Sequence, residues 1–73
     1  MPGLRPLSGR DCIKALSRTG WVWTSTKGSH AKLVKPGLPA VIVPLHPELG
    51  RGTLRAIIRQ SGMTVDEFLR LVG

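Results

Sequence analysis

The first regular pattern of hydrophobic and polar positions along the chain has the period of a helix. Its apolar positions form one stripe: Cys12, Ile13 and Leu16. Its basic positions recur every four residues on another face: Arg10, Lys14 and Arg18. Ser8 can cap the first turn and Asp11 places an acid in it, so we expect the helix to begin at Ser8. Gly20 ends it, because glycine readily adopts the left-handed conformation that follows a helix end.

Three short segments then have the alternation and β-branched composition of strands: residues 21–24, 30–34 and 40–43. Turns are predicted at residues 26–28 and 36–39, and Pro44 closes the third strand. Connections this short cannot join parallel strands, because a parallel pairing needs a crossover of about a dozen residues or more. The sheet is therefore predicted to be antiparallel.

The middle strand indicates which face of the sheet is covered. Ala31 and Leu33 point one way, whereas His30 and Lys32 point the other. An antiparallel sheet commonly has one face packed and one solvated. We therefore expect the apolar pair to face the helices and the polar pair to face water.

Two tryptophans, Trp21 and Trp23, share one face of the first strand. They are either core residues or a platform on which nucleic-acid bases stack. We interpret them as core, because a chain of this size has little else to fill its interior.

The last third of the chain returns to the helical period. A loop at residues 44–52 leads to a helix over residues 53–60, and Gly62 ends that helix. Thr64 and Glu67 form a capping box that opens a short third helix. The inward positions of the two helices are apolar: Leu54, Ile57 and Ile58 in the first, and Val65, Phe68, Leu69 and Val72 in the second.

These elements predict an α+β fold for a single domain spanning residues 1–73. The expected order is helix, three-stranded antiparallel sheet, helix and short helix (α-β-β-β-α-α), with the helices packed on one sheet face. Residues 1–7 read as an irregular lead-in. So small a core leaves room for an active site only on an open surface or shallow groove.

The charge balance indicates a polyanionic partner. Eleven Lys and Arg residues against four Asp and Glu residues give a net charge of +7 at pH 7. Such a charge concentrates polyanions near the surface, and nucleic acid is the commonest of them, ahead of an acidic protein or an anionic membrane. A solvated basic surface without a ligand is the alternative.

The remaining composition narrows the class of protein further. Cys12 has no partner for an intrachain disulfide, and no Cys/His cluster has the spacing of a zinc site, so we expect neither a metal nor a cofactor. No apolar stretch is suited to a signal peptide or a bilayer span, so no membrane association is expected. These features predict a soluble, cytoplasmic protein.

Arg51 and Arg55 flank the start of the second predicted helix, whose positive dipole end also attracts anions. We favour phosphate contact for both, and Thr53 can add a hydrogen bond there. Other basic helix positions are interpreted as solvated. His46, in the preceding loop, is either a second acid or a structural residue that bonds loop backbone, and we favour the structural role.

Five motifs occur in order along the chain: Gly20-Trp21, Gly28-Ser29-His30, Val43-Pro44-Leu45-His46, Gly52-Thr53-Leu54-Arg55 and, after Ile57-Ile58-Arg59-Gln60, Gly62. This ordered set resembles the HicA (YcfA-like) toxins, and the likeness extends from about residue 7 to residue 71. The resemblance implies a fold like that of double-stranded-RNA-binding domains. It also implies the toxin of a type II toxin–antitoxin system, a metal-independent endoribonuclease that cleaves mRNA and is neutralised by a HicB-type antitoxin. The family's catalytic histidine corresponds to His30.

Two positions depart from the family pattern. Ala31 stands where many members have a second histidine, and Ser25 stands where many have an arginine five residues before the catalytic histidine. The first change matters little, because Ala31 should face the core. The second removes a phosphate contact and puts substrate affinity or rate in question.

The chemistry of the residues agrees with the role that the resemblance implies. Metal-free RNA cleavage needs a base for the ribose 2′-hydroxyl proton, and a histidine side chain can act as base or acid at cellular pH. Lys32 emerges from the same sheet face as His30, and Lys27 flanks the turn before it. Gly28 lets a phosphate approach the backbone, and Ser29 can donate a hydrogen bond.

Three other interpretations compete with the nuclease. In the first, the motif has no catalytic role and His30 is an ordinary exposed histidine in a hairpin. A non-catalytic RNA-binding module of the same fold would bind through basic residues and would need no histidine. A protein-interaction domain would be basic because it docks on an acidic partner, and its RNA affinity would be weak and nearly independent of salt.

Overall fold

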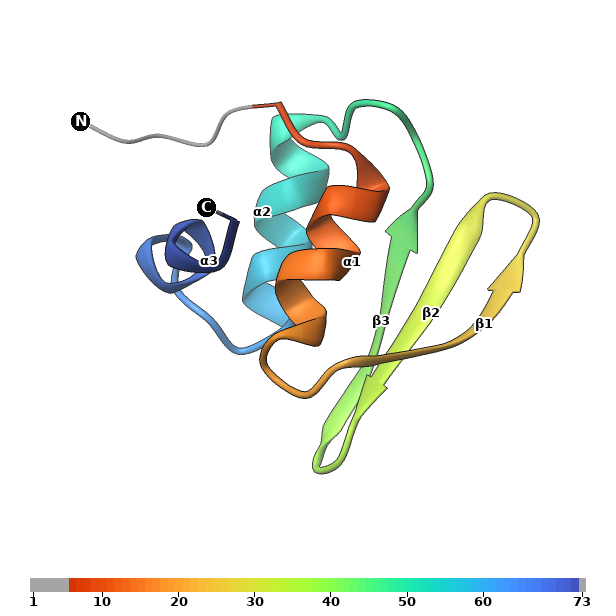
Figure 1. Ribbon diagram of the computed structural model, residues 1–73, viewed down its shortest axis with the longest axis horizontal. Coiled ribbons are helices and arrows are strands. Elements are labelled where there is room, and N and C mark those ends of the chain that lie inside the picture. Colours follow the sequence, from red (N-terminus) through yellow and green to blue (C-terminus); the bar gives the residue numbers. More distant parts are fainter. Residues whose placement is uncertain (1–5, 73) are drawn as a thin grey trace.

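The computed structural model describes residues 6–72 and has the predicted order of elements (Figure 1). In chain order these are α1 (Gly9–Ser17), β1 (Val22–Lys27), β2 (His30–Lys35), β3 (Leu38–Pro44), α2 (Arg51–Gln60) and α3 (Val65–Val72). The α+β fold with the order α-β-β-β-α-α is therefore confirmed. Residues 1–5 of the predicted lead-in lie outside the described residues, whereas Leu7 is buried in the core. Among the described residues, no helix is long and apolar enough to cross a membrane.

The three strands form one antiparallel sheet in the order β1-β2-β3, as predicted. Two-residue turns at residues 28–29 and 36–37 join them. Gly28 has a φ of +60°, a conformation that glycine adopts without strain and that lets the chain reverse within two residues. As a result Lys27 and His30 are paired across the hairpin.

The element boundaries differ from the predicted ones where the turns are shortest. β1 runs to Lys27 and β3 begins at Leu38, so the predicted turns at residues 26–28 and 36–39 are too long or misplaced. Pro39 lies inside β3, where it is tolerated because β3 is an edge strand. The helix α2 begins at Arg51, two residues earlier than predicted.

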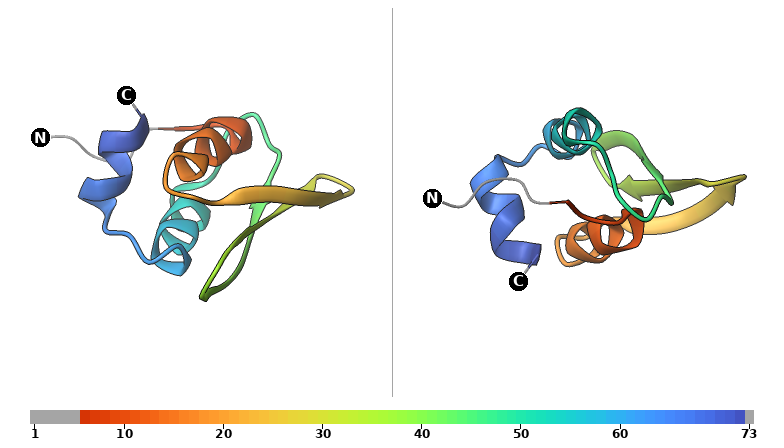
Figure 2. Two further views of the ribbon diagram at one scale, coloured as in Figure 1. Left: turned by 60° about the horizontal axis from the view of Figure 1, so that its bottom comes forward. Right: turned by 90° about the horizontal axis from the view of Figure 1, so that it is seen from above.

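The helices form two layers on one side of the sheet. The helices α1 and α2 contact the strands, and α3 packs on α1 and α2 rather than on the sheet. Figure 2 shows α3 on the side of these two helices that faces away from the strands. Helix packing on one sheet face is thus confirmed, with α3 forming an additional outer layer.

The core lies between the sheet and the helices. Ala31 and Leu33 of β2 are fully buried, as the alternation predicts, and they pair with Val43 and Val41 of β3. Phe68 brings α3 into the same cluster. Cys12 is also buried, and this burial raises the pKa of its thiol to about 12. The thiol is therefore protonated at neutral pH and serves as a small core side chain.

The predicted caps are present at two helix starts. The Ser8 hydroxyl oxygen accepts a hydrogen bond from the Asp11 amide at 3.0 Å. The Thr64 amide donates to the Glu67 carboxylate at 2.8 Å, while the Glu67 amide donates to the Thr64 hydroxyl at 3.1 Å, which is a complete capping box. The backbone and side-chain hydrogen bonds from Thr64 lower the pKa of the Glu67 carboxyl. Both caps confirm the sequence prediction.

Candidate functional site

His30 is the first residue of β2, the central strand, and its side chain is exposed on the solvent face of the sheet. It is paired with Lys27 on β1 and with Pro44 on β3. Paired positions place their side chains on the same face with Cβ atoms about 5 Å apart. Lys32, also exposed, lies two residues further along the same face. The hairpin therefore brings one imidazole and two ammonium groups together, as predicted.

The turn before His30 is held in place by the segment that follows β3. The Leu45 amide donates a hydrogen bond of 2.7 Å to the carbonyl oxygen of Ser29. Gly28 and the Ser29 side chain are exposed, and a Cβ atom at Gly28 would meet nothing within 4 Å. A phosphate can thus approach the turn from solvent, while the backbone that carries His30 is fixed on both sides.

The start of α1 supports this arrangement from the helix side. The Gly9 amide donates a hydrogen bond of 2.9 Å to the carbonyl oxygen of His46. A Cβ atom at Gly9 would lie 1.9 Å from the carbonyl oxygen of Pro44, the residue paired with His30. The helix is therefore seated directly against the end of β3.

His46 is exposed, and its contact with α1 is made by its backbone carbonyl rather than by its imidazole. The loop is thus tied down at His46 without the use of its ring. The structural role predicted for the side chain and its alternative role as a second acid both stay predictions.

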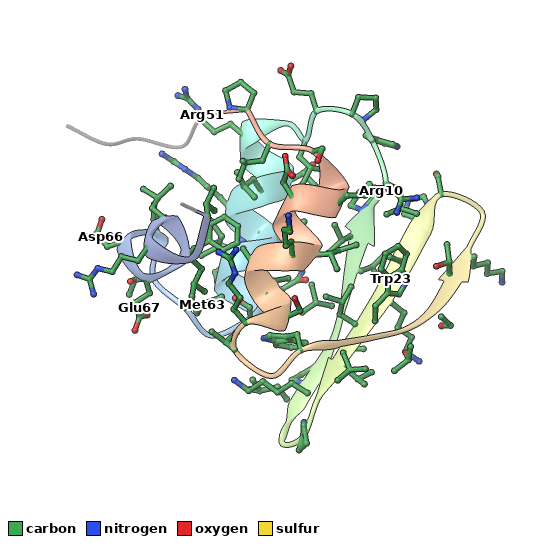
Figure 3. The ribbon with its side chains drawn as sticks, in the orientation of Figure 1. Arg10, Trp23, Arg51, Met63, Asp66 and Glu67 are labelled. Carbon is green, nitrogen blue, oxygen red and sulfur yellow. The ribbon has the colours of Figure 1, made fainter. Side chains whose placement is uncertain are left out.

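The remaining predicted contacts lie at the start of α2: Arg51, Thr53 and Arg55. All three are exposed, and the helix cap at Gly50 makes no side-chain hydrogen bond, which leaves first-turn amide groups available to an anion. Figure 3 shows Arg51 on the opposite side of α1 from the β1–β2 hairpin. The predicted RNA contacts therefore fall into two groups, a hairpin group (Lys27, Gly28, Ser29 and Lys32) and an α2 group (Arg51, Thr53 and Arg55).

Trp23 was predicted to be a core residue, and this prediction is wrong. Trp21 is 2% exposed and buried as expected, whereas Trp23 is 38% exposed. The guanidinium carbon of Arg10 lies over the Trp23 ring, 5.7 Å from the ring centroid, which is a cation–π contact (Figure 3). The sequence pattern places Arg10 on the basic face of α1. It does not show that this face meets Trp23, because the position of α1 over β1 depends on packing between distant segments.

Among residues 6–72, no three His, Cys, Asp or Glu side chains form a group that could hold a metal ion. The groups that the hairpin offers to a ligand are an imidazole, ammonium groups, a hydroxyl and backbone amides. These groups can accept or donate protons and can neutralise the charge of a phosphate.

Comparison with known proteins places these residues in context. A family model described as "HicA toxin of bacterial toxin-antitoxin" matches residues 9–63, which include α1, the sheet and α2. A solved chain from a toxin–antitoxin complex of Streptococcus pneumoniae is 37% identical, with a TM-score of 0.72. The likeness covers 80% of this chain and 100% of that chain. No curated protein matches.

Proposed function

Because the chain belongs to the HicA toxin family, we propose that it is a toxin that cleaves mRNA as an endoribonuclease with His30 as its general base and acid. The observation that carries the proposal is the exposed position of His30 on the solvent face of β2, paired with Lys27 and followed on that face by Lys32. An imidazole beside two ammonium groups suits an anionic substrate that must lose a proton in order to react.

In the proposed reaction the imidazole of His30 takes the proton from a ribose 2′-hydroxyl. The 2′-oxygen attacks the adjacent phosphorus, and the bond from phosphorus to the 5′-oxygen breaks as that oxygen gains a proton. The products are a 2′,3′-cyclic phosphate and a 5′-hydroxyl end. Lys27 and Lys32 stabilise the extra negative charge at phosphorus, and the exposed Gly28–Ser29 turn offers an amide and a hydroxyl to a phosphate oxygen. Protonated His30 can supply the proton that the 5′-oxygen gains, and the exposed His46 would be the donor only in the alternative role of its side chain.

The first prediction concerns metal dependence, because proton transfer by imidazole needs no metal. Purified protein should cut a single-stranded RNA as fast in EDTA as in magnesium, and the fragments should carry cyclic phosphate ends. Gel electrophoresis of end-labelled RNA measures both. Cleavage that stopped in EDTA and returned with magnesium would show that the metal-free mechanism is wrong.

We also propose that a HicB-type antitoxin binds the chain and neutralises it. The similar solved chain comes from a toxin–antitoxin complex, and the net charge of +7 favours an acidic partner. A bound partner would also raise the apparent stability of so small a fold by mass action. Copurification with the product of a neighbouring gene, and inhibition of cleavage by that product, test this proposal.

The second prediction separates the two groups of basic residues by salt dependence. Each phosphate contact contributes about 0.7 to the slope of log affinity against log salt for single-stranded nucleic acid. We expect Lys27→Ala combined with Lys32→Ala to reduce that slope by about 1.4, and Arg51→Ala combined with Arg55→Ala to do the same. Fluorescence anisotropy with labelled RNA at several salt concentrations measures the slope.

The control for the α2 pair is Arg59→Ala, which removes one exposed charge from the last turn of the same helix. It should leave the slope unchanged. If the double variant at Arg51 and Arg55 behaved like Arg59→Ala, the α2 group would not contact RNA, and the hairpin alone would form the interface.

A non-catalytic RNA-binding module is the second candidate, and the serine at position 25 favours it. Ser25 lies opposite Lys32 on the face of His30, where many family members have an arginine. A module that only binds would show the same salt dependence but would produce no fragments. The cleavage assay therefore separates the two candidates directly.

A further inference from the structure

Trp23 is an exposed aromatic residue whose position is fixed by three contacts. Its indole nitrogen donates hydrogen bonds to the carbonyl oxygen of Ser25 at 3.1 Å and to the hydroxyl of Thr26 at 2.7 Å. The guanidinium group of Arg10 lies over its ring. An exposed ring held in this way loses little conformational entropy when it binds a ligand.

A β-bulge determines the side of the hairpin on which this ring lies. The register shifts between Trp23 and Ser25, so that Trp23 pairs with the inward residue Leu33, while Ser25 pairs with the outward residue Lys32. The ring therefore lies on the helix side of β1, and the lysines lie on the other side with His30. This ring is not part of the core cluster, whereas Trp21, two residues earlier, belongs to it and is 2% exposed.

The charge around Trp23 favours a nucleic-acid strand as its ligand. Arg10 is the cation beside the ring. Lys14 and Arg18 continue the basic stripe toward α3, where the Arg18 guanidinium donates to the carbonyl oxygen of Leu71. Asp11 follows Arg10 in the sequence and is the acidic residue of this helix. Its backbone amide donates to the Ser8 hydroxyl in the helix cap. Indole rings and guanidinium planes both stack on unpaired bases, and the positive charge of Arg10 suits a phosphate next to such a base.

The position of Trp23 relative to His30 suits one continuous RNA strand. β1 is an edge strand of the sheet, so a strand can pass from one face of the hairpin to the other around it. Leu33, which pairs with Trp23, is three residues from His30 along β2, or roughly 10 Å at the rise of a β-strand. A few nucleotides can cover that separation and the crossing of the edge.

We propose that Arg10 and Trp23 form a stacking platform for one unpaired base of the RNA, a few nucleotides from the phosphate at His30. This inference rests on the proposed function and adds to it a requirement for unpaired RNA on the helix side of the hairpin. The lysines hold the strand on one face of the hairpin, and the platform holds a base on the other.

The test measures the binding of a short unpaired RNA in a His30→Ala background, in which the RNA stays intact. Trp23→Ala should weaken binding roughly 5- to 100-fold, and Trp23→Phe should restore part of the loss because it keeps a ring. Arg10→Lys, which keeps the charge but not the planar group, should weaken binding less than Arg10→Ala. In the protein with His30 intact, Trp23→Ala should raise KM and leave kcat nearly unchanged.

Val22→Ala is the matched control, because Val22 is the adjacent residue of β1, is 57% exposed and lies on the opposite face. It should bind RNA like the parent protein. Circular dichroism of each variant confirms that it is folded, so that weak binding can be assigned to the missing ring.

The outcomes separate the platform from the proposed function. If the parent protein neither bound nor cleaved RNA, the proposed function would fall. If it cleaved RNA and Trp23→Ala bound RNA as tightly as Val22→Ala, only the platform would be wrong. If Trp23→Ala lost affinity for the antitoxin and kept its affinity for RNA, this surface would be a protein-docking site, which also overturns the proposal.

Discussion

Replacement of His30 by alanine should abolish both RNA cleavage and growth arrest while the protein stays folded. Proton transfer by a positioned side chain contributes about 10²–10⁴-fold to a rate, so cleavage should fall by at least that factor. Stability should change by no more than about 0.5 kcal/mol, because the side chain is exposed and its backbone pairing does not depend on the ring. Single-turnover cleavage, growth after induction and thermal unfolding measure the three effects.

Ser25→Ala is the matched control for this prediction. Ser25 is exposed on the same sheet face, and alanine there also removes one polar side chain from a strand. This variant should cleave RNA and arrest growth like the parent protein. If His30→Ala still cut RNA at the parent rate, or lost activity only because it unfolded, His30 would not be the catalytic group.

The position of His30 could be predicted because it depends on a short-range pattern. Side chains alternate across a strand, so the burial of Ala31 and Leu33 requires His30 and Lys32 to face solvent. The helix caps at Ser8 and Thr64 are equally local, since each involves residues three positions apart. Features of this kind follow from a few consecutive residues.

The features that could not be predicted depend on contacts between distant segments. The bulge in β1 lets Trp23 pair with the inward residue Leu33, and the exposure of its ring there depends on how far α1 covers that strand. The separation of Arg51 from the hairpin depends on the route of residues 45–50. Nothing in the local pattern indicates that Gly9 lies against Pro44, which is 35 positions away in the sequence.

The close approach at Gly9 leads to a prediction about folding, a large loss of stability in Gly9→Ala. The added Cβ atom would lie 1.9 Å from the carbonyl oxygen and 2.9 Å from the carbonyl carbon of Pro44. Both are backbone atoms, so α1 and the end of β3 must move apart, and the hydrogen bond from Gly9 to His46 weakens. We expect the free energy of unfolding to fall by about 3 kcal/mol or more, a large part of the total for a domain of this size. Urea denaturation measures this loss.

Gly52→Ala is the matched control, because the same chemical change should raise the stability of the protein there. Gly52 lies in the first turn of α2, and a Cβ atom there would meet nothing within 4 Å. Alanine should stabilise the helix by about 0.5–1 kcal/mol, because it restricts the unfolded chain and favours helical backbone. Cleavage should decrease in Gly9→Ala, since Pro44 is paired with His30, and should persist in Gly52→Ala. Equal stability of Gly9→Ala and the parent protein would mean that α1 does not pack against β3 at this point, and the support described for His30 would then be wrong.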